Sequence, residues 1–152
     1  MNKVSKNIKE TNEIAKEFLN KLKPVKSGAT VVGLYGDLGA GKTTLTQAIG
    51  RLLKIKRKLN SPTYVIIKNY ELQTTNYKKL FHIDAYRLKN EKELQQLGWE
   101  EIISNPENLV FIEWPERVIK IMPKKHHQIH ILHLPAQAGT KEGYRKFEIK
   151  NN

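Results

Sequence analysis

The spacing of apolar positions along the chain marks the buried strands of a sheet. Compact runs in which most residues are apolar are typical of strands covered on both faces. Three such runs stand out, at Thr30–Tyr35, Lys79–Asp84 and Asn108–Glu113. Weaker strand patterns follow at Tyr64–Leu72, Gln128–Leu134 and Tyr144–Ile149.

Helices are expected between these strands. Apolar residues three and four positions apart are typical of an amphipathic helix. This spacing occurs at Glu10–Leu22, Thr43–Leu53 and, over shorter stretches, at Glu91–Leu97 and Pro115–Met122. Strands that alternate with helices predict an α/β fold with a mainly parallel central sheet.

Length and composition favour one domain. The chain has 152 residues, of which 39% are hydrophobic, and no internal repeat or linker divides it, so we expect residues 1–152 to form a single core. No apolar run approaches the roughly 20 residues of a membrane helix, and no apolar signal core follows Met1. The absence of cysteine excludes a disulfide framework and a thiolate metal site. We therefore expect a cytoplasmic enzyme without membrane contact.

The formal net charge of +12 leaves two interpretations open. Basic side chains cluster at residues 54–58 and 123–127 but are otherwise spread along the chain. They either form a solvated, lysine-rich surface or contact an anionic macromolecule such as RNA. Charge alone does not decide between them, because phosphate contacts carry little sequence information.

The strongest chemical signal is a phosphate-binding loop. Residues Gly36–Thr43 read GDLGAGKT and fit the pattern G-x-x-x-x-G-K-[ST], between a predicted strand and a predicted helix. Glycines let successive N–H groups face inward, and the following helix adds its unpaired N–H groups and dipole. In such a loop Lys42 contacts the β- and γ-phosphates and the Thr43 hydroxyl is placed to bind Mg²⁺.

Two predicted strands end in a carboxylate, at Asp84 and Glu113. Ligands of parallel sheets bind beyond the carboxyl ends of the strands, so these acids would lie near the phosphates. Each can bind Mg²⁺ directly, hold a metal-bound water or orient the attacking water. The alternative is that each caps a helix or pairs with a surface lysine.

Two further features adjoin this region. The segment Ser61–Tyr64 follows the first helix after the loop, where Thr63 would reach Mg²⁺ or the γ-phosphate if the segment closes; an ordinary turn is the alternative. Trp114 follows Glu113 and would either shield the phosphates from water, face a partner or pack in the core.

The nucleotide is expected to be ATP. An Asn-Lys-x-Asp motif, which reads guanine in GTPases, is absent from the sequence. A small-molecule kinase is the rival enzyme class, but it usually needs a lid that carries arginines. The chain has five arginines, and they do not cluster. Hydrolysis used as a switch is therefore the more economical interpretation.

Four stretches in this order closely resemble the TsaE (YjeE) family of bacterial ATPases: GDLGAGKTTL, SPTY, FHIDAYRL and VFIEWPER. The resemblance implies a three-layer domain of the P-loop NTPase type and ATP hydrolysis. It also implies a role in forming N6-threonylcarbamoyladenosine (t6A) at position 37 of tRNAs that read codons beginning with A. In that family the protein acts with the TsaB–TsaD pair, so tRNA contact would be indirect, through the complex.

The resemblance also implies roles for individual residues. The phosphates would be held by Gly39, Ala40, Gly41, Lys42, Thr43 and Thr44. Thr43 and Glu113 correspond to the Mg²⁺ positions, Asp84 to the second acidic motif and Thr63 to the switch-like segment. Thr11 matches a threonine that contacts the nucleotide, although a helix N-cap is what its sequence context favours.

Arg145 is a weaker match to a Gly-Arg pair near the nucleotide, because Tyr144 separates it from Gly143. Four histidines at 126, 127, 130 and 133 lack the cysteine or carboxylate that would complete a metal site, so we expect a basic surface strand there.

These features predict a Mg²⁺-dependent ATPase that assists tRNA modification, with Lys42, Asp84 and Glu113 as its catalytic residues. A small-molecule kinase and a nucleotide-gated RNA-binding module remain the alternatives.

Overall fold

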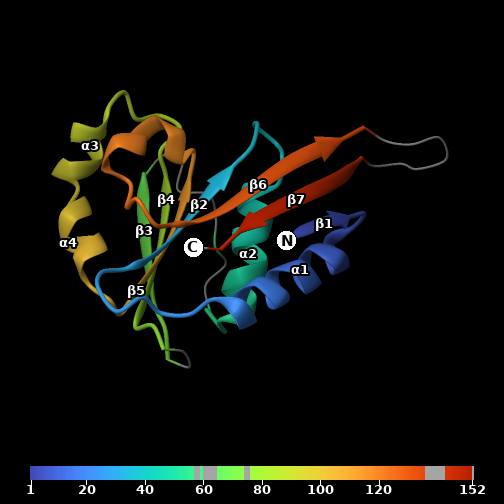
Figure 1. The fold of residues 1–152 in the computed structure, drawn as a ribbon, viewed down its shortest axis with the longest axis horizontal. Helices are drawn as coiled ribbons and strands as arrows, with labels where there is room; N and C mark the ends of the chain where they lie inside the picture. The colour runs from blue at the N-terminus through green and yellow to red at the C-terminus, as the bar shows by residue number, and fades with distance from the viewer. Residues whose placement is uncertain (57–58, 60–64, 74–75, 136–142, 152) are drawn as a thin grey trace.

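A seven-stranded sheet forms the centre of the molecule (Figure 1). The computed structural model describes residues 1–56, 59, 65–73, 76–135 and 143–151. The strand order is β1-β7-β6-β2-β5-β4-β3. The strands are β1 (Asn2–Ser5), β2 (Thr30–Tyr35), β3 (Ile67–Glu71), β4 (Lys79–Asp84), β5 (Asn108–Glu113), β6 (His127–Leu134) and β7 (Tyr144–Lys150). The helices are α1 (Ile8–Lys21), α2 (Lys42–Leu52), α3 (Glu91–Gln96), α4 (Trp99–Ser104) and the 3₁₀ helix η1 (Pro115–Ile121).

The sheet is mixed, so the expectation of a mainly parallel sheet is wrong. Parallel pairing is confined to the central strands β6, β2, β5 and β4. On one side β7 and β1 add in antiparallel fashion, and on the other β3 pairs antiparallel with β4. The pairs β3–β4 and β6–β7 are consecutive in the chain, and strands joined without a crossover helix must run antiparallel.

Two hydrophobic cores cover the two faces of the sheet. Side chains alternate along β5: Leu109 and Phe111 belong to one core, Val110 and Ile112 to the other. The first core packs against α1 and α2, and the second packs against α3, α4 and η1. Figure 1 shows these two groups of helices on opposite sides of the sheet, which gives three layers.

Several element boundaries differ from the expectations. The bounds of β2, β4 and β5 agree with the predicted strands. Helix α1 begins earlier, because the Asn7 side chain caps it by accepting a hydrogen bond from Glu10 N at 3.0 Å. Thr11 is therefore not the N-cap. The segment after Pro115 is a 3₁₀ helix with a kink at Val118 instead of a regular α-helix.

Other elements were not predicted. The sequence patterns missed strand β1 and helix α4, each of six residues or fewer. The predicted strand at Tyr64–Leu72 is shorter, since β3 covers only Ile67–Glu71, and residues 60–64 lie outside the described part of the chain. Within the described residues, no helix has the length and apolar character needed to cross a membrane.

Candidate functional site

The loop between β2 and α2 has a backbone that requires glycine. Gly36 and Gly41 have φ angles of 142° and 110°, in a region that other residues rarely adopt. A Cβ at Gly36 would overlap the Ile131 carbonyl, and a Cβ at Gly41 would lie 2.9 Å from Arg145 Nε. Gly41 is also the N-cap of α2 and offers no side-chain cap. The first N–H groups of α2 are thus left for an anion.

The Lys42 ammonium lies inside this loop. Its Nζ donates hydrogen bonds to the carbonyl oxygens of Gly36 at 2.5 Å and Asp37 at 3.0 Å. It also lies 4.0 Å from the centre of the Trp114 ring, and the residue is only 4% exposed. Burial lowers the pKa of Lys42 from its ordinary value, while nearby carboxylates, Glu113 foremost, oppose that shift.

A cavity of about 240 Å³ opens beside Lys42. It lies at the carboxyl ends of β2, β4 and β5, where parallel α/β sheets bind their ligands. The lining residues are Leu38, Gly39, Gly41, Lys42, Thr43, Thr44, Asp84, Tyr86, Glu113 and Trp114. This single cavity thus brings together the phosphate loop and both acidic strand ends.

The two carboxylates are neighbours in the sheet. Asp84 and Glu113 are register partners on β4 and β5, and they are 4% and 3% exposed. Glu113 accepts a hydrogen bond from Thr43 Oγ1, at 3.1 Å to Oε1 and 3.4 Å to Oε2. Asp84 Oδ1 accepts one from Tyr86 N at 2.9 Å. Both carboxylates are thus buried at the cavity.

This arrangement suits Mg²⁺ better than a metal held by protein alone. Among the described residues, no group of three or more His, Cys, Asp or Glu side chains is placed to hold a metal ion. Magnesium usually takes one or two carboxylates and completes its shell with waters and phosphates. The Thr43 hydroxyl and the Glu113 carboxylate, which lie within hydrogen-bond distance of each other, fit that pattern.

His82 is a site residue that the sequence analysis missed. It lies on β4 with no exposed surface, and its Nε2 is 2.8 Å from Glu113 Oε1. An ionised carboxylate only accepts hydrogen bonds, and with Glu113 in that form the hydrogen lies on Nε2. Nδ1 is buried without a hydrogen-bond partner among the described residues. A histidine inside an apolar run resembles an ordinary core residue, so only its side-chain contact with Glu113 reveals it.

Trp114 forms one wall of the cavity. It adopts a left-handed backbone with φ of 60°, which turns the chain sharply after β5. Its ring packs on Lys42 on one side and lies 5.0 Å from the Tyr86 ring, which in turn faces Arg117 at 5.8 Å. The tryptophan therefore covers the lysine and also packs against the second core.

The N- and C-terminal strands reach the phosphate loop from the other side. Arg145 Nε donates a hydrogen bond to the Ala40 carbonyl at 3.1 Å. Arg145 is the register partner of Ser5, whose hydroxyl lies 2.7 Å from Thr11 Oγ1. Thr11 is buried and does not line the cavity, so its nucleotide contact stays a prediction. Thr63 lies outside the described residues.

The histidines near β6 are not all on the surface. His126 and His127 are 6% and 7% exposed. His126 lies 2.9 Å from the Tyr35 hydroxyl, and His127 packs edge-on against Phe18. The interpretation of a basic surface strand is therefore wrong for these two residues.

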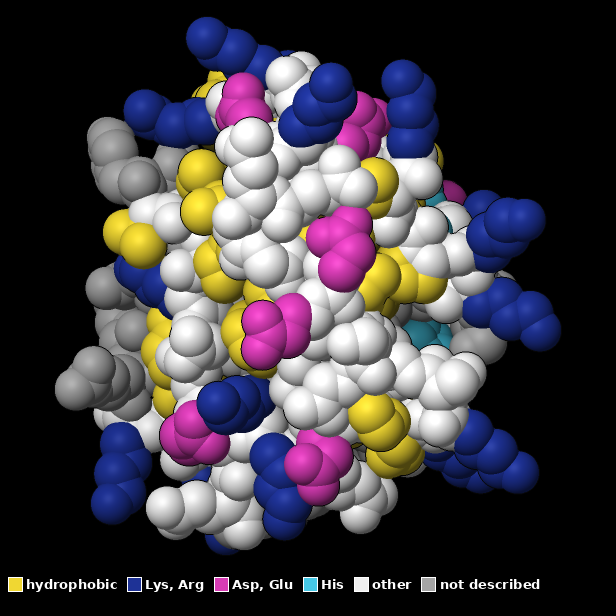
Figure 2. Space-filling model, turned by 90° about the vertical axis from the view of Figure 1, so that its left-hand side faces the viewer, with side chains coloured by type: hydrophobic (Ala, Val, Ile, Leu, Met, Phe, Trp, Pro, Cys, Tyr) yellow, Lys and Arg dark blue, Asp and Glu magenta, His cyan; other side chains and the backbone are white. Residues whose placement is uncertain are grey.

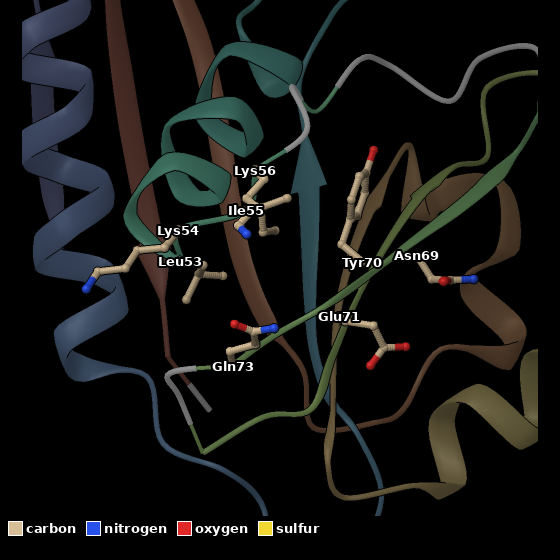
Figure 3. Close-up of a pocket in the computed structure, with 8 residues that line it drawn as sticks. All are labelled: Leu53, Lys54, Ile55, Lys56, Asn69, Tyr70, Glu71 and Gln73. Carbon is tan, nitrogen blue, oxygen red and sulfur yellow. The ribbon is translucent and has the colours of Figure 1, made fainter.

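A larger cavity, of about 520 Å³, lies between the end of α2 and β3. Figure 3 shows its lining side chains: Leu53, Lys54, Ile55, Lys56, Asn69, Tyr70, Glu71 and Gln73. None of them is a site residue expected from the sequence. The smaller cavity is the better candidate, because convergent polar groups and not volume mark a binding site.

Comparison with known proteins gives one consistent family. The family model described as Threonylcarbamoyl adenosine biosynthesis protein TsaE matches residues 5–142. The tRNA threonylcarbamoyladenosine biosynthesis protein TsaE of Bacillus subtilis (strain 168) is 38% identical over 125 residues, which cover 82% of this chain and 73% of that protein. The protein of the same name from Haemophilus influenzae is 36% identical over 115 residues, which cover 76% of this chain and 69% of that protein.

A solved structure is similar over the whole chain. The crystal structure of Bacillus subtilis YdiB superposes with a TM-score of 0.72 at 30% sequence identity. The match covers 100% of this chain and 86% of the other. The fold described above, with its mixed sheet, is therefore one that a solved structure shares.

Replacement of His82 tests whether it positions Glu113. His82→Leu removes the N–H donor to the buried carboxylate, and a hydrogen bond to a charged group contributes about 1.5 to 3 kcal/mol. We expect the free energy of unfolding in urea to fall by that amount. His82→Gln keeps an N–H donor and should recover part of the loss. Equal stability of wild type and His82→Leu would contradict the positioning role.

Proposed function

The chain belongs to the TsaE family, and on that premise we propose that it is a Mg²⁺-dependent ATPase of the P-loop NTPase type. We propose further that it acts in the cytoplasm with the TsaB–TsaD pair in forming t6A at position 37 of tRNAs that read codons beginning with A. The family name supports the pathway. One observation supports the chemistry: the phosphate loop, Thr43 and the two acidic strand ends line one cavity.

The phosphate loop binds the triphosphate through its backbone and one side chain. The free N–H groups at the start of α2 donate to phosphate oxygens, as helix N-termini do for anions. Lys42 gives up its contacts with the Gly36 and Asp37 carbonyls and donates to the β- and γ-phosphates. Because Lys42 is already buried, the charge acts in a site from which most water is excluded.

The carboxylates at the two strand ends are proposed to position the metal ion and the attacking water. Thr43 and Glu113 would hold a Mg²⁺ ion, directly or through a water. Such an ion would supply positive charge to balance that of the phosphates. His82 fixes the Glu113 carboxylate by its hydrogen bond to Oε1. Asp84 orients the attacking water or holds a metal-bound water, and Trp114 limits the entry of bulk water.

Six further residues complete the proposed nucleotide site. Gly39 and Thr44 line the cavity, and Ala40 is held by Arg145. Arg145 thus supports the loop from behind, in addition to any contact with the nucleotide. Thr11 contacts the Ser5 hydroxyl, and Ser5 pairs with Arg145 in the sheet, so Thr11 supports the site indirectly. Thr63, in a segment outside the described residues, would sense the γ-phosphate.

Lys42→Ala tests the phosphate-loop assignment. Loss of the only ammonium in the loop should lower kcat/KM for ATP by about 100-fold or more, the size of effect seen when one preorganised donor is removed. ATP hydrolysis and binding of a fluorescent ATP analogue measure the change. Lys124→Ala, at an exposed lysine, is the matched control and should behave as wild type. Full hydrolysis by Lys42→Ala would remove the assignment.

Glu113→Gln tests the metal role. The amide preserves the shape of the side chain but removes its charge, so the Mg²⁺ dependence of turnover should weaken roughly 10- to 100-fold. Turnover measured across a magnesium titration, beside thermal melting of the same sample, separates chemistry from stability. A collapse of the melting temperature with parallel loss of activity would mean that Glu113 is structural.

The partnership is tested with purified TsaB–TsaD. The tagged chain should retain the pair on a column more strongly with ATP and Mg²⁺ than without, because the γ-phosphate is proposed to set the state of the partner surface. Lys42→Ala is the control for nucleotide dependence. Absence of retention under every nucleotide condition would refute the partnership but not the ATPase activity.

A further inference from the structure

The face that carries α3 and α4 differs in charge from the rest of the molecule. Residues 91–104 contain four glutamates and one lysine, in a chain whose net charge is +12. Figure 2 shows this face: acidic and hydrophobic side chains run down its middle, and most lysines and arginines lie toward its rim. An acidic, partly apolar face is the exception on a basic protein.

A groove of about 530 Å³ lies on this side, between α4 and the strands β3 and β4. We call it the α4 groove. Its apolar surface comes from Val65, Ile67, Phe81 and Leu97. Its charged surface comes from Glu101 and Glu107 and from Lys78 and Lys79, of which Lys79 pairs with Glu71 at 3.5 Å. Val65 is 63% exposed and Leu97 is 47% exposed. Large apolar side chains that share one groove at such exposure mark an interaction site.

The groove exists because α4 is too short to cover the edge of the sheet. Side chains alternate along a strand, and the residues of β3 and β4 that line the groove are all odd-numbered, so they share one face. Helix α4 has six residues and buries only Trp99 and Ile102. Among the described residues, no strand pairs with the outer edge of β3.

The acidic side chains of this face form no ion pair with the described part of the chain. Within the described residues, no lysine or arginine lies within ion-pair distance of Glu91, Glu93, Glu100, Glu101 or Glu107. The sequence offers 27 basic residues, so this is not a shortage of cations. These carboxylates are therefore available to the basic side chains of a partner.

We propose that the α4 groove docks a segment of a partner protein that presents an apolar side chain flanked by lysine or arginine. The apolar side chain fills the groove against Leu97 and Phe81, and its basic neighbours face Glu101 and Glu107. This pairing of an apolar centre with a charged rim is typical of specific protein interfaces. The inference rests on the proposed function in one respect, since the TsaB–TsaD pair is taken as the source of that segment.

The groove is connected to the nucleotide cavity by one main-chain contact. Asp84 N donates a hydrogen bond to Ile66 O at 2.9 Å. Ile66 lies between Val65 and Ile67 of the groove, and its φ of 66° is rare for a β-branched residue. A segment that presses on Val65 and Ile67 therefore acts next to a strained residue that holds the end of β4. Partner and nucleotide would thus affect each other through Asp84.

Two pairs of variants test the docking surface. Glu101→Lys reverses a charge of the groove, and Glu13→Lys makes the same change at an exposed glutamate on α1. Leu97→Ala removes an apolar contact of the groove, and Leu132→Ala does so on β6, where the leucine is 46% exposed. All four positions are surface sites, and melting temperatures should stay near that of wild type.

Binding to purified TsaB–TsaD is measured by calorimetry at two salt concentrations. Glu101→Lys and Leu97→Ala should each weaken binding about tenfold or more, as central interface residues do. The two controls should stay within roughly twofold. Higher salt should weaken wild-type binding more than that of Glu101→Lys, because an attractive charge pair is screened.

Each other outcome overturns the proposal in a distinguishable way. If the groove variants bind TsaB–TsaD as wild type does, the proposed docking surface is wrong and the proposed partnership stands. A wild-type chain that binds ATP but not TsaB–TsaD would refute both the partnership and the surface. If light scattering shows that wild type is a dimer and the groove variants are not, the occupant of the groove is a second copy of this chain. If wild type binds tRNA and the groove variants do not, the occupant is RNA.

Discussion

The buried carboxylate of Glu113 joins the phosphate loop to the sheet. A carboxylate that is 3% exposed is costly unless hydrogen bonds replace its water. Thr43, in the first turn of α2, and His82, on β4, supply those bonds. The two donors lie on different elements and meet at one carboxylate on β5. Their hydrogen bonds therefore fix the position of α2 relative to β4 and β5. The loop between β2 and α2 therefore lies over the same carboxylate, and Lys42 lies beside both acidic strand ends.

The antiparallel half of the sheet shapes the loop from the opposite side. The Ile131 carbonyl on β6 leaves room at Gly36 only for hydrogen, and Arg145 on β7 packs on Gly41 while it holds the Ala40 carbonyl. Strand β1 covers the other edge of β7 and orders Arg145 next to Ser5. The antiparallel strands β7 and β1 therefore contribute to the proposed nucleotide site.

Some parts of the fold and of the site can be predicted from the sequence, and others cannot. The strands β2, β4 and β5 and the phosphate loop were predictable because their signals are local: continuous apolar runs and glycines at fixed spacing. Strand β1 gave no signal, since its pairing with β7 joins residues at opposite ends of the chain and Val4 is its one apolar side chain. Helix α4 has too few residues for a helical spacing of apolar positions to be recognised. The role of His82 depends on a side-chain contact with Glu113 on the neighbouring strand. A mixed sheet likewise depends on strand pairings that no local pattern encodes.

The state of Lys42 explains how a small, open cavity could bind a highly charged ligand. An exposed lysine would have to lose its water when it meets a phosphate, whereas Lys42 already has two carbonyl oxygens and an aromatic ring as its neighbours. Phosphate oxygens would replace neutral carbonyls, and hydrogen bonds to a charged acceptor are shorter and stronger than those to a neutral one. The fold therefore bears the desolvation cost of the lysine before a ligand binds. The surrounding carboxylates oppose the lowering of the Lys42 pKa by burial, and in the proposed function a metal ion would balance their charge against that of the phosphates.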